Sequence, residues 1–409
     1  MKIGYACTPL ITNARTNRRV LLKDFSHKNI YPIIEKNLND LHKILHCNKD
    51  NDIYLFRIGS DIIPLGSHEI NDFNWQKEFH TKLKLIGDFI RKNNMRVSMH
   101  PGQYTVINSP NEETLKKSLL DVEYHCSFLD SLEVDYKNKI ILHIGGVYGD
   151  KPMAKENFIK GFSSLSESAQ KRLIIENDEK SFSLDDVLEV SSKIHIPAIF
   201  DNLHNICFGD NSYTLNKIYS KVKKTWNNNL DGNIKVHYSQ QDLNKKKGSH
   251  SQSIAVTSFL DYYNQVENFN PDIMLEVKDK DISAIKILKT LKEINIGLSK
   301  EEFSSEIENY KLLLLQYDKD FHENTYGNIV DFYKYLDEAT TKEFDLIGFK
   351  YSLELAFNII DDYMTKREIS HFKKLIKEKD LKKAKLYLKK INSKIEIPPR
   401  ELAYYFSRN

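Results

Sequence analysis

The chain has 409 residues, of which 40% are hydrophobic and 29% are charged, so it can form a core larger than that of one average domain. The formal net charge of +3 does not by itself indicate a nucleic-acid partner, and four scattered cysteines without a CxxC pair argue against disulfides or a thiolate zinc site. We find neither a signal-peptide pattern nor an apolar run of about 20 residues, so we expect a cytoplasmic protein with no membrane partner.

Short runs rich in Ile, Val, Leu and aromatic residues recur in the first 280 residues, and longer amphipathic segments separate them. Eight strands are predicted, at Lys2–Cys7, Ile53–Gly59, Arg96–Pro101, Lys139–Gly145, Leu173–Asn177, Ala198–His204, Ile234–Ser239 and Ile273–Lys278. Strands that alternate with helices predict an α/β fold, a closed (β/α)8 TIM barrel. An open doubly wound sheet is the alternative, but no glycine-rich phosphate turn follows its first strand.

The strand-like runs stop near residue 300, whereas helical patterning continues to the end of the sequence. We therefore expect a barrel domain at 1–300 and a helical C-terminal extension at 301–409. Residues 301–365 contain 5 Lys+Arg and 15 Asp+Glu, whereas residues 366–409 contain 14 and 5. Residues 371–394 are predicted to form one basic amphipathic helix, whose lysines either pack as a solvated face against the acidic stretch or contact DNA phosphates.

Ionisable side chains lie at or just after nearly every predicted strand end, which is the catalytic face of a barrel. A lone histidine there is commonly a hydrogen-bonded core residue, but so many ionisable groups at one end would repel or desolvate one another unless cations held them together. Mixed imidazole and carboxylate ligands suit zinc or manganese, and this set exceeds one ion, so we predict a cluster of two or three. The set comprises His100, His143, Glu176, Asp201, His204, His237, His250 and Glu276.

Such a cluster suits phosphodiester hydrolysis, because one ion generates hydroxide from bound water while the others neutralise the phosphate and the leaving oxygen. Lys235 shares a strand face with His237 and is therefore predicted to point into the barrel. A protonated ammonium is disfavoured there, so we predict a neutral or chemically modified lysine. A twisted strand position for Lys235 is the alternative.

At these positions the chain resembles the UV damage endonuclease family, whose relatives include the endonuclease IV and xylose isomerase barrels. The resemblance covers about residues 1–280 and rests on the ordered motifs RIGSDIIPLGSH, SMHPGQYTVINSP, LHIGG, IENDE, DNLHN, KVHYS, GSHS and LEVKDK. It implies one metal held by His100, His143 and Glu176, with Glu176 bridging to a second. The remaining ligands of the second would be Asp201, His250 and Glu276, and His204 and His237 would hold a third.

The resemblance also implies manganese, with zinc as the alternative, and a catalytic set of Glu176, Lys235 and His68. In this set Lys235 would be an N6-carboxylysine and His68 would lie near it. Many relatives carry an asparagine just after the first strand, where this chain reads Cys7-Thr8-Pro9, so a lesion contact of that kind is not carried over.

Five residues match positions that the family uses near DNA: Gln103, Tyr104, Tyr5, Asn17 and Arg18. Gln103 and Tyr104 match a wedge, and an aromatic ring beside an amide can fill the gap left when damaged nucleotides leave the stack. Tyr104 as a pocket-lining aromatic is the alternative. Residues 15–19 could bind phosphates without reading sequence, or form an ordinary surface loop.

The resemblance implies a monomeric DNA repair endonuclease, associated with the nucleoid when on DNA, that nicks double-stranded DNA 5′ to UV photoproducts. Abasic sites are compatible with it as additional substrates. The alternatives are an abasic-site enzyme like endonuclease IV, a sugar isomerase of the same superfamily, and a non-enzymatic damage-binding protein with a structural metal. A sugar isomerase would have little use for an exposed Gln-Tyr loop.

Overall fold

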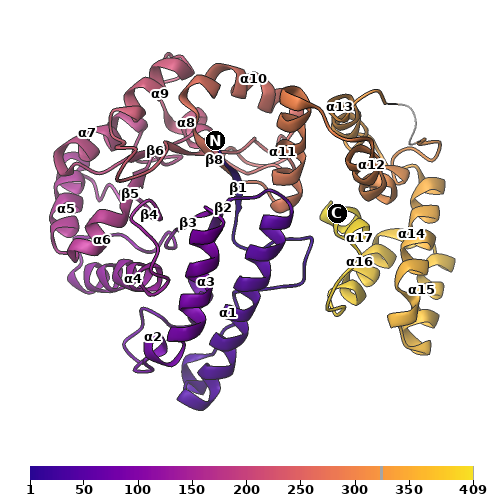
Figure 1. Ribbon diagram of the computed structural model, residues 1–409, viewed down its shortest axis with the longest axis horizontal. Coiled ribbons are helices and arrows are strands. Elements are labelled where there is room, and N and C mark those ends of the chain that lie inside the picture. The colour runs from indigo at the N-terminus through magenta and orange to yellow at the C-terminus, as the bar shows by residue number, and fades with distance from the viewer. Residues whose placement is uncertain (323–325, 409) are drawn as a thin grey trace. The chain divides into compact units, whose positions relative to one another are not determined.

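The computed structural model describes residues 1–322 and 326–408 and contains a closed barrel of eight parallel strands (Figure 1). The strands pair in chain order, and β1 closes the barrel against β8. They are β1 (Ile3–Ala6), β2 (Leu55–Ile58), β3 (Arg96–Met99), β4 (Lys139–His143), β5 (Leu173–Glu176), β6 (Ala198–Asp201), β7 (Lys235–Tyr238) and β8 (Asp272–Leu275). The predicted (β/α)8 TIM barrel is confirmed, and each strand is shorter than its predicted run.

The chain divides into two compact units, which we call the barrel unit and the helical unit. The barrel unit comprises Met1–Thr8, Ala14–Ser251 and Asp261–Lys278, and the helical unit comprises Pro9–Asn13, Gln252–Leu260 and Asp279–Asn409. The helices up to β8 are α1 (His27–Asp50), α2 (Trp75–Glu78), α3 (His80–Lys92), α4 (Glu112–Ser131), α5 (Lys151–Ser163), α6 (Glu167–Arg172), α7 (Leu184–Ile194), α8 (Asn202–Phe208), α9 (Leu215–Lys223) and α10 (Val256–Val266).

The barrel helices form where apolar residues recur with helical spacing and a capping residue starts the turn. Helix α3 buries Leu83, Ile86 and Ile90 on one face. Helix α7 begins with a capping box, in which the Ser183 side chain accepts from the Asp186 amide and the Asp186 side chain accepts from the Ser183 amide. These helices cover the strands, whose residues are almost all buried.

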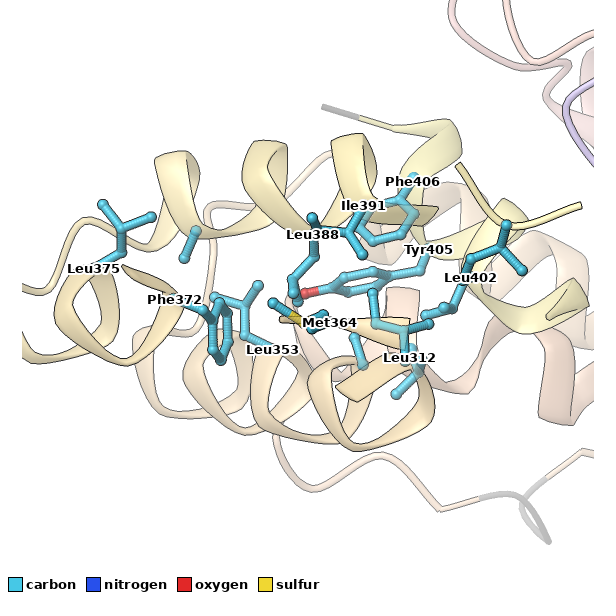
Figure 2. Close-up of a cluster of buried hydrophobic side chains, with 14 of the residues drawn as sticks. Leu312, Leu353, Met364, Phe372, Leu375, Leu388, Ile391, Leu402, Tyr405 and Phe406 are labelled. Carbon is cyan, nitrogen blue, oxygen red and sulfur yellow. The ribbon is translucent and has the colours of Figure 1, made fainter. Parts of the chain in front are cut away.

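Every element in residues 279–322 and 326–408 is helical, in agreement with the expected helical extension. Apolar side chains of these helices form a separate hydrophobic cluster, in which Leu353, Leu388 and Tyr405 are fully buried (Figure 2). No described helix is long and apolar enough to cross a membrane. The helices are α11 (Asp281–Ile296), α12 (Lys300–Leu315), α13 (Ile329–Ala339), α14 (Leu346–Ile360), α15 (Lys366–Lys377), α16 (Leu381–Asn392) and α17 (Arg400–Ser407).

The prediction of one basic helix over residues 371–394 is wrong, because the segment forms a helical hairpin of α15 and α16. Lys379 adopts a left-handed conformation with φ 57°, which ends the first helix. Asp380 then caps the second helix by accepting from the Lys383 amide at 3.2 Å. The apolar spacing runs through this break, and therefore it gave no sign of the turn.

Burial within the helical unit lowers the pKa of Lys385 to about 7, and its ammonium donates to Gln316 Oε1 at 2.9 Å. Because the unfolded chain keeps the ordinary lysine pKa, it holds more protons than the folded protein between about pH 7 and 10. We therefore expect stability to rise with pH across this window, and the slope to be smaller in Lys385→Met. Thermal unfolding of both proteins from pH 7 to 10 measures the difference; parallel curves would contradict it.

Candidate active site

Glu176, the last residue of β5, lies at the centre of a cluster of imidazoles at the carboxyl end of the barrel. Its Oε1 accepts from His237 Nδ1 at 2.7 Å and lies 3.6 Å from His204 Nδ1. Its Oε2 lies 3.3 Å from His100 Nε2 and 3.9 Å from His143 Nε2. Four histidines from four separate segments therefore converge on one carboxylate that is 1% exposed.

Strand register places these side chains next to each other. His143 on β4 pairs with Glu176 on β5, and Asp201 on β6 pairs with His237 on β7. His204 is not on the strand, contrary to the prediction, but lies in the first turn of α8, where the Asp201 side chain accepts from its amide at 2.7 Å. The cap at Asp201 thus brings a second carboxylate and another imidazole to the same site.

Seven of the eight predicted ligands fall into three overlapping groups, whose ligand atoms lie within 4.8 Å of one another in each group. The eighth, His250, lies close enough to Glu276 for its charge to lower the pKa of that carboxyl group. All eight residues belong to the barrel unit. The groups are His100, His143 and Glu176; Glu176, Asp201 and His204; and Asp201, His237 and Glu276.

Electrostatics in the cluster favour neutral imidazoles, the form that binds metals. Burial lowers the pKa values of His100, His143 and His237. His204 differs, because Asp201 and Glu176 outweigh its burial and raise its pKa to about 9. His204 Nδ1 lies 2.9 Å from the Asn177 carbonyl, to which it can donate, so Nε2 remains as the ligand atom once that nitrogen is deprotonated.

The surroundings of the Asp201 carboxylate suit a metal ligand better than a residue that only stabilises the fold. Its Oδ1 caps α8, whereas its Oδ2 is buried and has no hydrogen-bond partner among the described residues. Burial, together with the nearby carboxylates of Glu176 and Glu276, raises the pKa of Asp201 to about 7. A buried carboxylate oxygen without a donor is costly, and a divalent cation would satisfy it. The donor set therefore fits the metal cluster predicted from the sequence.

Arg57 on β2 is a site residue that the sequence reasoning did not identify. Its guanidinium forms an ion pair with Glu276 and donates to His237 Nε2 at 2.9 Å. Burial opposes the ionised form of Glu276, but Arg57 and His237 hold its pKa well below the ordinary value. The sequence did contain a sign of this residue, because a charged side chain is unusual inside an apolar run such as Ile53–Gly59. The glutamate that ends β5 is unusual for the same reason.

Lys235 points into the barrel, as predicted, and donates to Ser98 Oγ on β3 at 2.5 Å. Burial strongly lowers its pKa, and the nearby charges of Arg57 and Arg96 add to this effect. His68 lies elsewhere, because its side chain is exposed and lines a surface cavity with Tyr104, whereas Lys235 is 1% exposed. The structure therefore does not bring His68 and Lys235 together.

Gln103 and Tyr104 lie side by side in the loop after β3, and both are exposed, with Tyr104 71% accessible. Gln103 lines a cavity of about 370 Å³ against His100, His143 and His204. Tyr104 lines a separate cavity of about 500 Å³ beside α4. The loop thus lies between the cluster and the outer surface of the barrel, where a second macromolecule could reach it.

The other predicted DNA contacts differ among themselves. Asn17 is exposed, whereas Arg18 is half-buried and its guanidinium contacts Asp40 on α1 at 2.6 Å. Tyr5 is not exposed for the predicted contact with DNA, because its side chain is fully buried and its hydroxyl donates to Asn48 Oδ1 at 2.7 Å. Its position on β1 directs the ring toward α1 and the core.

Comparison with known proteins gives a consistent assignment. The family model described as UV-endonuclease UvdE matches residues 1–308. The chain belongs to this UV-endonuclease family. A relative described as a UV DNA damage endonuclease, from Clostridium perfringens strain 13, is 66% identical over 412 residues that cover 100% of both chains. A crystal structure of a protein named SacUVDE shares 38% identity at a TM-score of 0.69, covering 73% of this chain and 100% of that one.

Several other members of the UV-endonuclease family match only part of the chain. The UV DNA damage endonuclease of Bacillus cereus strain B4264 is 30% identical over 293 residues, which cover 70% of this chain but 91% of that protein. The predicted ligands lie between residues 100 and 276, inside the range that matches the family model. The helices after residue 308 lie outside that range, although the Clostridium perfringens relative matches them as well.

Proposed function

We propose that this protein is a metal-dependent DNA repair endonuclease that nicks the backbone 5′ to UV photoproducts in double-stranded DNA, and does so as a monomer at the nucleoid. The observation that supports this most directly is Glu176, which is enclosed by four imidazoles and belongs to two of the three ligand groups. Membership of the UV-endonuclease family supports the DNA substrate.

Two or three divalent ions, manganese in the first instance, would supply Lewis acidity toward the phosphate and an activated water when bound. His100, His143 and Glu176 would hold one ion, and Asp201, with its unpaired Oδ2, would hold another. Deprotonation of His204 accompanies its ligation, so loading of the site should release protons. Zinc would fit the same donors.

The remaining residues act on the DNA and on the cluster. Gln103 and Tyr104 would fill the gap left by extruded damaged nucleotides, since both are exposed and Gln103 lines the cavity beside the imidazoles. Asn17 would contact the backbone. Burial holds Lys235 as a neutral amine, which would add to dissolved carbon dioxide and lose one proton to solvent, giving an anionic carbamate able to face the ions.

A nicking assay tests the function. A duplex oligonucleotide with one thymine photodimer and a 5′ label is incubated with the protein and Mn²⁺, with EDTA, and with EDTA followed by excess Mn²⁺. We expect one cut immediately 5′ to the dimer, its loss in EDTA and its return with manganese. The undamaged duplex is the matched control. Cleavage that persists in EDTA, or that occurs equally in undamaged DNA, would contradict the proposal.

The alternative activities need separate substrates in the same buffers. An abasic duplex distinguishes a photoproduct enzyme from one like endonuclease IV, since the latter would cut the abasic duplex and leave the photodimer intact. Ketose isomerisation without any DNA cleavage would favour the sugar isomerase. Lesion binding that is unaffected by EDTA, again without cleavage, would favour a damage-binding protein.

A further inference from the structure

The α15–α16 hairpin concentrates cations in the part of the chain that the family model does not match. Residues 366–394 contain 12 Lys+Arg and 3 Asp+Glu, whereas residues 301–365 contain 5 and 15. The excess of positive charge therefore lies in one helical hairpin and is not a general property of the helical unit.

Packing fixes which side of the hairpin faces outward. Phe372 and Leu375 on α15 and Leu388 on α16 are buried in the apolar cluster shown in Figure 2. Lys366, Lys373 and Lys377 have spacings of seven and four residues, so they share the opposite face of α15, and all three are exposed. We call these three residues the α15 lysine row.

The α15 lysine row is not neutralised by the acidic residues of the same unit. Over the described part of the chain, Lys366, Lys373 and Lys377 form no ion pair. The hairpin's ion pairs are local, such as Lys383 with Asp380 at 2.7 Å. A lysine face packed against the acidic stretch 301–365 would require ion pairs between the two segments, and this row makes none there.

We propose that the α15 lysine row binds the phosphate backbone of duplex DNA, independently of sequence and of damage. The helix has 12 residues, which makes it about 18 Å long, and a duplex presents on the order of ten charges over that length. Lysines on flexible stems suit such a diffuse target, because they contact phosphates as point charges. The apolar face of the hairpin is buried, which disfavours insertion into a lipid surface.

This role is an addition to the catalytic barrel. The Bacillus cereus relative carries its UV DNA damage endonuclease name although its match covers only 70% of this chain. A phosphate-binding hairpin would hold the enzyme on undamaged DNA during the search for lesions, since non-specific affinity is mostly electrostatic. The inference rests on the proposed DNA substrate, and its test measures binding rather than cleavage so that the two can fail separately.

The test measures the affinity of the full-length protein for an undamaged duplex between about 50 and 200 mM salt. The variant carries Lys366→Gln, Lys373→Gln and Lys377→Gln, and the control carries Lys334→Gln, Lys342→Gln and Lys350→Gln. The control lysines are exposed, lie in the same unit and change the net charge equally. We expect the salt slope of the variant to be shallower by about 2 to 3, with at least about tenfold weaker binding at the lowest salt, and the control to match the native protein.

Equal slopes and affinities for the variant and the control would overturn the proposal, as would a loss seen only with a photodimer duplex, because phosphate contacts do not depend on damage. Unchanged helical circular dichroism and unfolding temperature of the variant would exclude loss of the hairpin itself. If the native protein failed to nick damaged DNA while the slope difference persisted, the proposed cleavage would be wrong and the phosphate-binding surface would stand.

Discussion

Glu176→Gln is expected to lower the nicking rate by at least about a thousandfold, because one carboxylate serves two ligand groups and a neutral amide cannot bridge two cations. The change is nearly isosteric, so the fold should survive. The measurement combines initial nicking rates on a photodimer duplex with the bound metal content of the purified protein. We expect the metal content to fall together with the rate.

Glu179→Gln is the matched control for this variant. Glu179 lines the same cavity as His100 and His143, but it is exposed and lies outside the three ligand groups. The same chemical change there should leave the rate and the metal content close to native. A native rate in Glu176→Gln, or equal losses in both variants, would show that the cluster does not carry the reaction.

Arg57→Ala is expected to destabilise the metal-free protein by about 3–5 kcal/mol, the range for removing one partner of a buried ion pair. Without Arg57, the Glu276 carboxylate would face Glu176 and Asp201 with no permanent cation beside it. If manganese binds the cluster as proposed, it would replace that cation, so the loss should shrink when the metal is added. Chemical unfolding in EDTA and in excess Mn²⁺ gives the two values of the free energy of unfolding.

Arg96→Ala separates this effect from the general cost of breaking a buried pair. Arg96 contacts Asp272 at 2.9 Å with side chains that are 7% and 3% exposed, at the amino end of the strands and away from the cluster. The Arg96→Ala change should destabilise the protein by the same amount in EDTA and in excess Mn²⁺. If excess Mn²⁺ changed the free energy of unfolding of both variants equally, Arg57 would have no special role in the cluster.

The sequence predicted the barrel and most of the cluster for the same physical reason. Apolar runs long enough for one strand each, separated by amphipathic segments, allow few arrangements other than a closed parallel sheet, and they place residues such as His143 and Glu176 at neighbouring strand ends. The eight ligand positions could thus be chosen before any contact was known. Their assignment to particular ions stays a prediction.

Three features were not predicted, because they depend on local backbone geometry or on which way a side chain points. The break at Lys379 left the apolar spacing intact. Tyr5 is on the expected strand, but alternation along that strand directs its ring to the core. Arg57 required knowing that its strand position faces the barrel interior, where Glu276 and His237 meet it.

The two oxygens of the Asp201 carboxylate have different environments, and this difference affects how the site is assembled. One oxygen holds the first turn of α8 and the other is buried without a hydrogen-bond partner among the described residues, so the rotamer of this predicted ligand is set when the helix forms. The cavity is therefore preorganised by folding itself, and little ordering of this side chain remains for the ion to impose. For the same reason we expect position 201 not to tolerate glutamate, since a side chain longer by one methylene would displace the start of α8 and a predicted ligand together.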